Sequence, residues 1–203
     1  CSRVCCETPL MIGTCGIDEA GRGPLAGPVT AAAVILGPEF DVSTLRDSKA
    51  LPAERRNELR ATITRDCVAW GVGWSGPREI DRMNIHHASL AAMRRAFWGL
   101  GAVPERVLVD GRFCPDLPVG CTPVVHGDRL VPEIQAASIL AKTIRDAWMF
   151  DHARREPLYG FDRHKGYPTP QHRALILRHG PSSIQRLSFS VSRGRGVDLG
   201  SDE

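Results

Sequence analysis

The chain has 203 residues, of which 42% are hydrophobic and 24% charged, a balance that describes one globular domain able to bury a core. No stretch approaches the roughly 20 consecutive apolar residues of a membrane-spanning helix. Residues 1–13 lack the basic and then apolar segments of a secretory signal. The composition therefore excludes a membrane protein, and we expect a cytoplasmic one.

The formal net charge of +3 says little about partners, but the choice of basic residues is uneven. Among 26 basic residues only Lys49, Lys142 and Lys165 are lysines. An arginine-rich composition can simply reflect a GC-rich genome, and it also makes the three lysines candidates for specific roles. The seven cysteines form no C-x-x-C pair and their number is odd, so we expect buried free thiols, without a disulfide framework or a zinc site.

The first half of the chain alternates short apolar runs with one charged segment. A strand is predicted to end at residues 15–17, and an alanine-rich apolar strand covers residues 29–36. Residues 51–65 are predicted to form a charged helix with Pro52 in its first turn. Residues 68–74, which alternate apolar and small side chains, indicate a third strand.

The segment 84–100 has the clearest helical pattern in the sequence. We predict that Asn84 caps its beginning and that Gly101 directly follows its end. Apolar side chains at helical spacing form one stripe along it: Ile85, Ala88, Ala92, Met93, Ala96, Phe97 and Leu100.

The second half continues with short strands and helices. Strands are predicted at residues 106–110 and 122–125, a long helix at 133–153, and a last helix at 170–179 that stops at Gly180-Pro181. This order of elements predicts an α/β fold with a central mixed sheet flanked by helices. In such folds, polar residues at strand ends usually carry the chemistry.

Acidic residues follow two of the predicted strands. Asp18 and Glu19 come directly after the first strand, and Asp110 ends the run Val107–Val109. Buried carboxylates are costly unless positive charge neutralises them. Arginines would do so in a structural role, whereas Mg²⁺ or Mn²⁺ would do so in a catalytic one, since oxygen-only clusters suit these ions. The residues alone leave both interpretations open.

The glycines beside the first acids form a second signal. Gly21-Arg22-Gly23 would let backbone amides and a guanidinium approach a phosphate or a sugar closely. Pro24 and Pro28 interrupt the segment, so it is neither a P-loop nor a dinucleotide-binding turn. An ordinary turn is the alternative.

The segment from Gly16 to Val29 resembles the opening signature of ribonuclease HII, the type 2 ribonuclease H. The resemblance spans residues 15–190. Further matching blocks follow in the same order: Asp47-Ser48-Lys49, Val109-Asp110-Gly111, Gly127-Asp128, the Ala136–Lys142 block, Arg145-Asp146, the His164–Tyr167 block and Leu187-Ser188-Phe189.

The resemblance implies a ribonuclease H-like fold with a C-terminal helical portion, over a domain of residues 14–190 with flexible termini at 1–13 and 191–203. It implies an endonuclease that hydrolyses the RNA strand of RNA–DNA hybrids and incises 5′ of ribonucleotides embedded in duplex DNA. The implied mechanism uses two Mn²⁺ or Mg²⁺ ions and leaves 3′-hydroxyl and 5′-phosphate ends. The implied partners are these nucleic acids, and we expect a monomer that does not bind membranes.

Carried onto this sequence, the resemblance makes Asp18, Glu19 and Asp110 the metal ligands. Asp128 is our first choice for a fourth catalytic carboxylate, and Asp146 is the alternative.

The alternative has a physical basis in the long helix. Ser138, Lys142 and Asp146 recur at every fourth position, a polar stripe on an otherwise apolar helix. Lys142 and Asp146 would instead simply pair with each other if this stripe has no catalytic role.

The resemblance also assigns substrate contacts. Gly21, Arg22 and Gly23 would read the 2′-hydroxyl that distinguishes RNA from DNA. Tyr167 would pack on the neighbouring deoxyribose, although an ordinary loop aromatic is the alternative. Two lysines, Lys49 and Lys165, would bind phosphates without reading the sequence, with Arg46 as a further candidate.

Three other functions fit the residues less well. A non-catalytic hybrid-binding domain would be expected to lack one of the three acids, and none is missing. A nucleotide-binding enzyme would need a P-loop lysine, and none follows Gly23. A different metal nuclease on the same fold would not need Tyr167 or the Gly-Arg-Gly turn.

Overall fold

The structure is a computed structural model that describes residues 12–45 and 52–191. Most of the termini that we expect to be flexible lie outside these ranges. The centre of the molecule is one five-stranded sheet with the strand order β3-β2-β1-β4-β5. The strands are β1 (Thr14–Ala20), β2 (Val29–Ile35), β3 (Ala69–Ser75), β4 (Arg106–Asp110) and β5 (Cys121–Val124).

The sheet is mixed, as predicted. The strands β1, β2 and β3 pair antiparallel, whereas β4 runs parallel to both β1 and β5. β1 extends beyond its predicted end at residue 17, so Asp18 and Glu19 belong to the strand itself. Since Ile17 lies opposite Val109 in the parallel pair, Asp18 and Asp110 reach the same level of the sheet.

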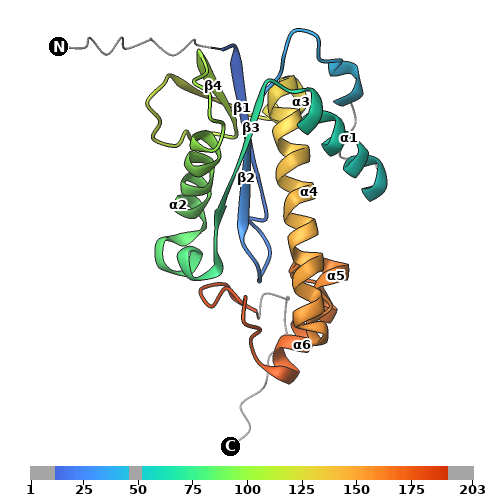
Figure 1. Ribbon diagram of the computed structural model, residues 1–203. Coiled ribbons are helices and arrows are strands. Elements are labelled where there is room, and N and C mark those ends of the chain that lie inside the picture. The colour runs from blue at the N-terminus through green and yellow to red at the C-terminus, as the bar shows by residue number, and fades with distance from the viewer. Residues whose placement is uncertain (1–11, 46–51, 192–203) are drawn as a thin grey trace, which may run out of the picture.

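Helices cover both faces of this sheet. α2 packs on one face, and α4 and α1 lie on the other (Figure 1). Two short helices, α5 and α6, lie beside the lower half of α4 and form the predicted C-terminal helical portion. The helices are α1 (Ala53–Asp66), α2 (Pro77–Trp98), α3 (Gly127–Leu130), α4 (Pro132–Arg155), α5 (Phe161–His164) and α6 (Pro170–His179), with 3-10 turns at Val42–Leu45 and Pro157–Tyr159.

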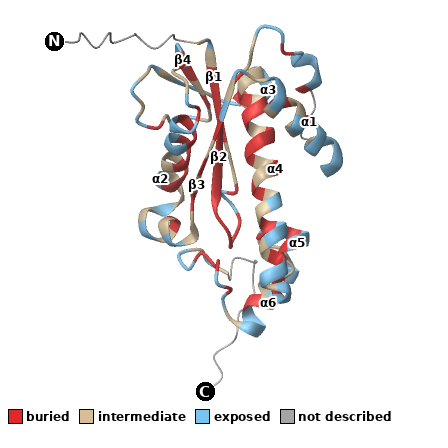
Figure 2. Ribbon diagram, viewed as in Figure 1, coloured by how far each residue is buried: buried red, intermediate tan, exposed pale blue. Residues whose placement is uncertain are grey.

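The central strand explains why both faces need a cover. All seven residues of β2 are buried, which Figure 2 shows as an unbroken red strand. Alternate residues such as Ala33 face the core under α2, and their neighbours such as Val34 face the core under α4. α4 lies so close to β1 that a Cβ at Gly16 would come within 2.2 Å of the Glu133 carbonyl carbon. This contact fixes α4 beside the acid-bearing strand.

The helix predicted at 84–100 is partly wrong. α2 begins at Pro77, and Asn84 interrupts it with φ 67° and ψ 166°. The Asn84 side chain still accepts the backbone N–H of His87 at 3.2 Å, so it does cap the second segment. The helix ends at Trp98, and Gly99, not Gly101, caps it. The part of α2 that precedes Asn84 escaped prediction because Ile80 is its only fully buried residue.

Two smaller expectations need adjustment. Pro52 is the N-cap of α1 and precedes its first turn. Of the four cysteines within the described ranges all are free, but only Cys15 is fully buried, and Cys67, Cys114 and Cys121 are partly exposed. Their positions at the rims of the cores leave part of each thiol uncovered.

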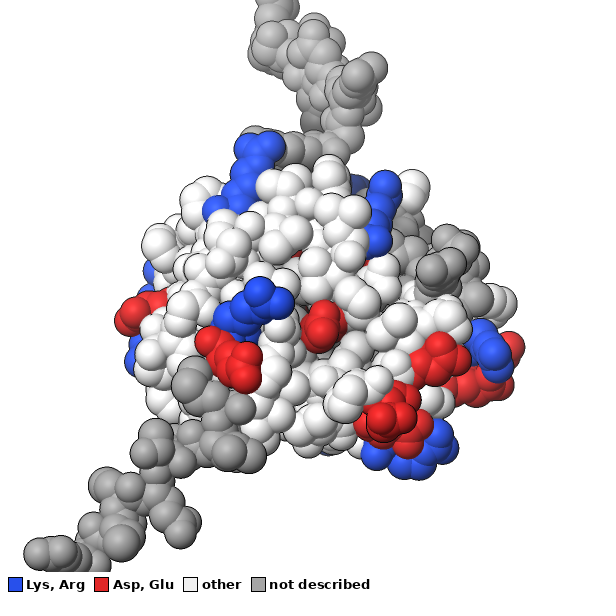
Figure 3. Space-filling view, turned by 90° about the horizontal axis from the view of Figure 1, so that it is seen from above, with Lys and Arg blue, Asp and Glu red and all other residues white. Residues whose placement is uncertain are grey.

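The face of the molecule seen from above gives no simple clue to a partner. Figure 3 shows acidic and basic side chains mixed over the face seen from above, without a field of one sign. Among the helices of the described residues, none has the length and apolar character needed to cross a membrane.

Candidate active site

The predicted acids gather in one pocket of about 370 Å³ at the edge shared by β1, β4 and α4. We call it the acid pocket. β1 and β4 bring Asp18 and Asp110 side by side, and α4 forms the opposite wall. Its lining residues are Asp18, Glu19, Ala20, Gly21, Arg56, Asp110, Asp128, Ser138, Ile139, Lys142 and Tyr167.

Asp18 lies deepest, with 6% of its surface exposed. One of its oxygens, Oδ1, accepts the backbone N–H of Glu19 at 2.7 Å. Burial raises the pKa of Asp18 well above its usual range, and the nearby charges of Glu19 and Asp110 raise it further. A hydrogen bond from Ser138 offsets only part of this rise. The neighbouring groups that the structure describes therefore leave most of this rise in pKa uncompensated.

Only one of the two carboxylate oxygens of Glu19 has a polar partner in the described residues. Its Oε1 pairs with Nη1 of Arg22 at 3.2 Å. Its Oε2 is buried and has no hydrogen-bond partner among the residues that the structure describes. Burial raises the pKa of Glu19, and Arg22 counteracts this rise. Buried oxygens without partners are unusual in folded proteins, and a cation bound beside Asp18 would satisfy this one.

A divalent cation fits this set of donors. Hard cations such as Mg²⁺ and Mn²⁺ prefer carboxylate oxygens, and their positive charge would lower the pKa values of Asp18 and Glu19. As they stand, however, no three Asp, Glu, His or Cys side chains in the described ranges are grouped closely enough to hold a metal ion. The acids would have to draw together around it.

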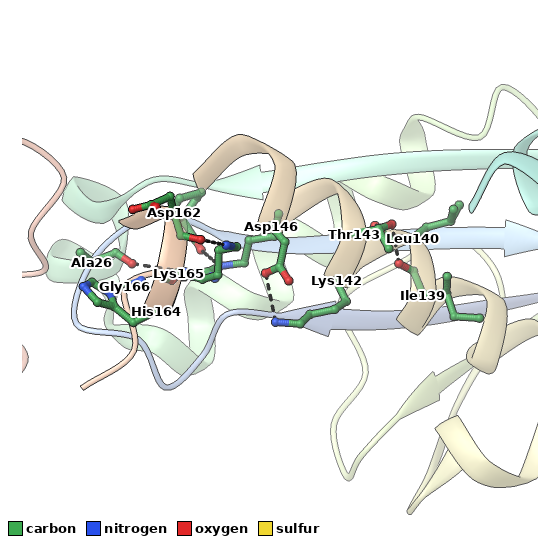
Figure 4. A network of polar contacts seen from close by, with 12 residues as sticks. Ala26, Ile139, Leu140, Lys142, Thr143, Asp146, Asp162, His164, Lys165 and Gly166 are labelled. Atoms are coloured by element: carbon green, nitrogen blue, oxygen red, sulfur yellow. Dashed lines mark hydrogen bonds and ion pairs between the residues drawn. The ribbon is translucent and has the colours of Figure 1, made fainter. Parts of the chain in front are cut away.

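The two candidates for the fourth acid lie in different places. Asp128 lines the acid pocket, and its backbone N–H donates to Oδ1 of Asp110 at 3.3 Å. Asp146 instead pairs with Lys142, whose Nζ lies 3.0 Å away, and the two side chains point toward each other in Figure 4. Asp146 lines a neighbouring hollow of about 330 Å³. The structure thus groups Asp128, and not Asp146, with the other acids.

The glycine loop, residues 21–28, borders the acid pocket. Its first residue has φ +93°, and a Cβ there would lie 2.1 Å from Nε of Arg145, so only glycine fits at Gly21. Arg22 is exposed apart from its contact with Glu19, and Gly23 is open to solvent. The backbone at Gly23 and the guanidinium of Arg22 are therefore accessible beside the acids, whereas Gly21 is buried.

Two buried arginines hold this loop in place. Arg145, from α4, donates to the carbonyl oxygens of Pro28 at 2.9 Å, Lys165 at 3.1 Å and Ala26 at 3.2 Å. Arg145 thereby ties the end of the loop to the segment that carries Tyr167.

Arg186 acts from the other end of the chain. It donates to the carbonyl oxygens of Gly27 at 2.8 Å, Arg22 at 3.0 Å and Gly21 at 2.6 Å. Both guanidinium groups are buried, which lowers the pKa of each. Six carbonyl oxygens are thus satisfied by two side chains.

Of the predicted substrate-binding residues outside the loop, one lies in the acid pocket and another lies outside it. Tyr167 lines the acid pocket, and its ring lies 5.5 Å from Nζ of Lys142. Lys165 turns away: its Nζ donates to the carbonyl oxygen of Asp162 (Figure 4), and it lines the neighbouring hollow. Lys49 and Arg46 lie outside the described residues.

Sequence reasoning missed several residues around the pocket. Arg56 lines both the acid pocket and the hollow beside it, yet in the sequence nothing distinguishes it from Arg55. Nothing in the sequence indicates that Arg145 and Arg186 bind carbonyl groups. Ser138 belongs to the polar stripe predicted on α4, and it forms a hydrogen bond with Asp18 in the acid pocket.

Comparison with known proteins agrees with the geometry. The family description "Ribonuclease HII" matches residues 15–192 of the chain. The chain belongs to the ribonuclease HII family. It is 55% identical to the ribonuclease HII of Nitrosospira multiformis over 88% of this chain and 90% of that protein. It is 50% identical to that of Burkholderia ambifaria over 91% and 85%. Members of this family are hydrolytic endonucleases, so the chain is an enzyme of that class.

Solved structures confirm the ribonuclease H-like fold. Ribonuclease HII of Archaeoglobus fulgidus, solved in complex with PCNA, has a TM-score of 0.73 at 27% identity and covers 91% of this chain and 98% of its own. Ribonuclease H2 of Pyrococcus horikoshii OT3 has a TM-score of 0.75 at 23% identity, over 89% and 95%. A Bst ribonuclease HIII, solved with Mn²⁺, has a TM-score of 0.71 at 18% identity, over 89% and 68%.

Proposed function

We propose that this ribonuclease HII hydrolyses the RNA strand of RNA–DNA hybrids and incises duplex DNA on the 5′ side of an embedded ribonucleotide. One observation carries the proposal: four acids, Asp18, Glu19, Asp110 and Asp128, line one pocket directly beside the glycine loop. Carboxylates alone suit any phosphodiester. The loop adds groups able to recognise a 2′-hydroxyl at the same place.

Asp18, Glu19 and Asp110 would hold Mn²⁺ or Mg²⁺, with Asp128 as the fourth catalytic carboxylate. The unpartnered Oε2 of Glu19 and the raised pKa of Asp18 support this assignment, and Mn²⁺ is the ion in the ribonuclease HIII structure. Two such ions, when bound, would supply an activated water and stabilise the leaving oxygen, which gives 3′-hydroxyl and 5′-phosphate ends.

The proposed substrate contacts combine the family resemblance with the position of the glycine loop and Tyr167 beside the acid pocket. Gly21, Arg22 and Gly23 would bind the ribonucleotide, and the exposed Tyr167 ring would pack on the next sugar. Lys165 and Lys49 would bind phosphates, and Lys165 would first have to leave the Asp162 carbonyl. A cytoplasmic location and a monomeric state remain predictions.

A panel of labelled duplexes tests the proposal. The substrates are an RNA–DNA hybrid, a DNA duplex with one ribonucleotide, an all-DNA duplex and an all-RNA duplex, each with Mn²⁺ or Mg²⁺ and each with EDTA. We expect cleavage of the first two only, and none with EDTA. Cleavage of the all-DNA duplex, or undiminished cleavage with EDTA, would contradict the proposal.

A further inference from the structure

Asp81 on α2 makes contacts that the proposed chemistry does not use. The backbone N–H of Leu187 donates to its Oδ2 at 2.9 Å. The backbone N–H and the hydroxyl of Ser188 donate to its Oδ1 at 2.9 and 2.6 Å. One carboxylate thus accepts three hydrogen bonds from a segment 106 residues further along the chain.

The residue next to this anchored pair is Arg186. Its side chain holds the carbonyl oxygens of Gly21, Arg22 and Gly27, and its backbone N–H donates to the carbonyl of Leu25 at 2.9 Å. Asp81 therefore fixes the backbone on one side of Arg186, and Arg186 fixes the glycine loop on the other.

The hydrogen bonds of Asp81 restrain the turn that carries Arg186 more than they stabilise the overall fold. The backbone donors on Leu187 and Ser188 lie at an exposed position, so water can satisfy them once the carboxylate is gone. The fold would then survive, whereas the turn that carries Arg186 would gain freedom. Ser188 also lines a hollow of about 430 Å³ together with Gly23 and Pro168. Movement of the turn would therefore change the surroundings of Gly23.

We propose that Asp81 is a positioning residue: through the turn 186–188 and Arg186, it sets the conformation of Gly21–Gly23 and thereby how strictly the enzyme requires a ribonucleotide. The inference rests on the proposed function, in which these residues bind the 2′-hydroxyl. Asp81 itself is not among the residues that line the acid pocket.

Equilibrium binding tests it. The dissociation constant is measured for a duplex with one ribonucleotide and for the identical all-DNA duplex, with Ca²⁺ in place of the active ion, and discrimination is their ratio. A smaller folded fraction changes both constants alike and leaves the ratio unchanged. The variants are Asp81→Ala, Asp81→Asn and Ser188→Ala, with Asp116→Asn, an exposed loop carboxylate, as the matched control.

We expect Asp81→Ala to reduce discrimination about tenfold, because a charged acceptor of three hydrogen bonds is lost. Asp81→Asn should reduce it less, and Ser188→Ala, which keeps both backbone bonds, least. Asp116→Asn should match the wild type. If Asp81→Ala does not fold, the other two variants decide the question.

Two failures are distinguishable. Unchanged discrimination in the Asp81 variants, with a wild type that does discriminate, overturns the role of Asp81 and leaves the proposed function standing. A wild type that binds both duplexes equally overturns the binding of the 2′-hydroxyl by Gly21–Gly23, and with it this inference, whereas the cleavage panel tests the proposed activity separately.

Discussion

The acid pocket and the glycine loop lie side by side but are held in opposite ways. In the acid pocket, Asp18 and Glu19 are buried with raised pKa values, and one oxygen of Glu19 has no partner in the described residues. In the loop, Arg145 and Arg186 satisfy five backbone carbonyls, and Arg145 binds a sixth at Lys165.

The difference separates two tasks. Groups left short of partners mark the place where something must bind, since an unsatisfied buried charge destabilises the protein until a ligand arrives. Groups that are fully satisfied form a rigid frame, and a rigid frame can position the substrate. Substitutions in the pocket should therefore affect activity far more than folding, and substitutions in the frame should affect folding directly.

The largest effect is expected in the pocket. Asp110→Asn should reduce single-turnover cleavage of a duplex with one ribonucleotide about a thousandfold, because a metal ligand contributes several kcal/mol to the transition state. Its thermal unfolding should stay close to that of the wild type. Asp116→Asn serves as the control, and a rate within tenfold of the wild type would place the metals elsewhere.

In the frame, Arg145→Met should lower the free energy of unfolding by about 3 kcal/mol, since three carbonyl oxygens lose their donor in a buried place. Arg154→Met, an exposed position on the same helix, is the matched control and should change it by less than about 0.5 kcal/mol. Urea unfolding measures both. Equal decreases in the free energy of unfolding of the two variants would show that the buried Arg145 guanidinium does not stabilise the fold.

The fourth acid is either Asp128 on α3 or Asp146 on α4. Asp128→Asn should slow cleavage about a hundredfold, because it removes a carboxylate beside Asp110. Asp146→Asn breaks only a partly buried pair with Lys142 outside the acid pocket, so cleavage should stay within about threefold. Rates of the two variants on one substrate give the answer, and the reverse order would make Asp146 the fourth acid.

A smaller effect depends on pH. His172 is buried, its Nδ1 lies 3.0 Å from the Tyr167 carbonyl oxygen, and burial lowers its pKa to about 4. The unfolded chain therefore binds the proton more readily, so stability is complete above about pH 6.5 and is lost as the pH falls toward 4. From pH 7 to pH 5 this amounts to about 2 kcal/mol.

The measurement is the urea-unfolding free energy of the wild type and of His172→Asn over this pH range. The variant should lose about 2 kcal/mol less than the wild type. His179→Asn, exposed on the same helix, should follow the wild type. Parallel curves for wild type and His172→Asn would show that this imidazole is not held neutral.

The sequence predicted the pocket better than the frame. Asp18, Glu19 and Asp110 stand out in the sequence because acids beside apolar strands are costly, and the resemblance assigns them to one site. The pairing of β1 with β4 brings Asp18 and Asp110 to the same level of the sheet. Arg145 and Arg186 give no such signal. Their partners are backbone carbonyls, which every residue carries, so only the folded chain shows which ones they reach.

Helix boundaries failed for a related reason. The first segment of α2 escaped prediction because it has a single buried residue, Ile80, and the chain bends at Asn84. That segment carries Asp81, so the part of the fold that the pattern missed is the part that anchors the turn beside Arg186.

The central claim is that a carboxylate-bound metal site cuts beside a ribonucleotide without using its 2′-hydroxyl as the nucleophile. The direct measurement maps the ends produced from a duplex with one ribonucleotide and Mn²⁺. We predict a single cut on the 5′ side of the ribonucleotide, with a 3′-hydroxyl on one fragment and a 5′-phosphate on the other. A cut on its 3′ side, or a cyclic 2′,3′-phosphate end, would contradict the account.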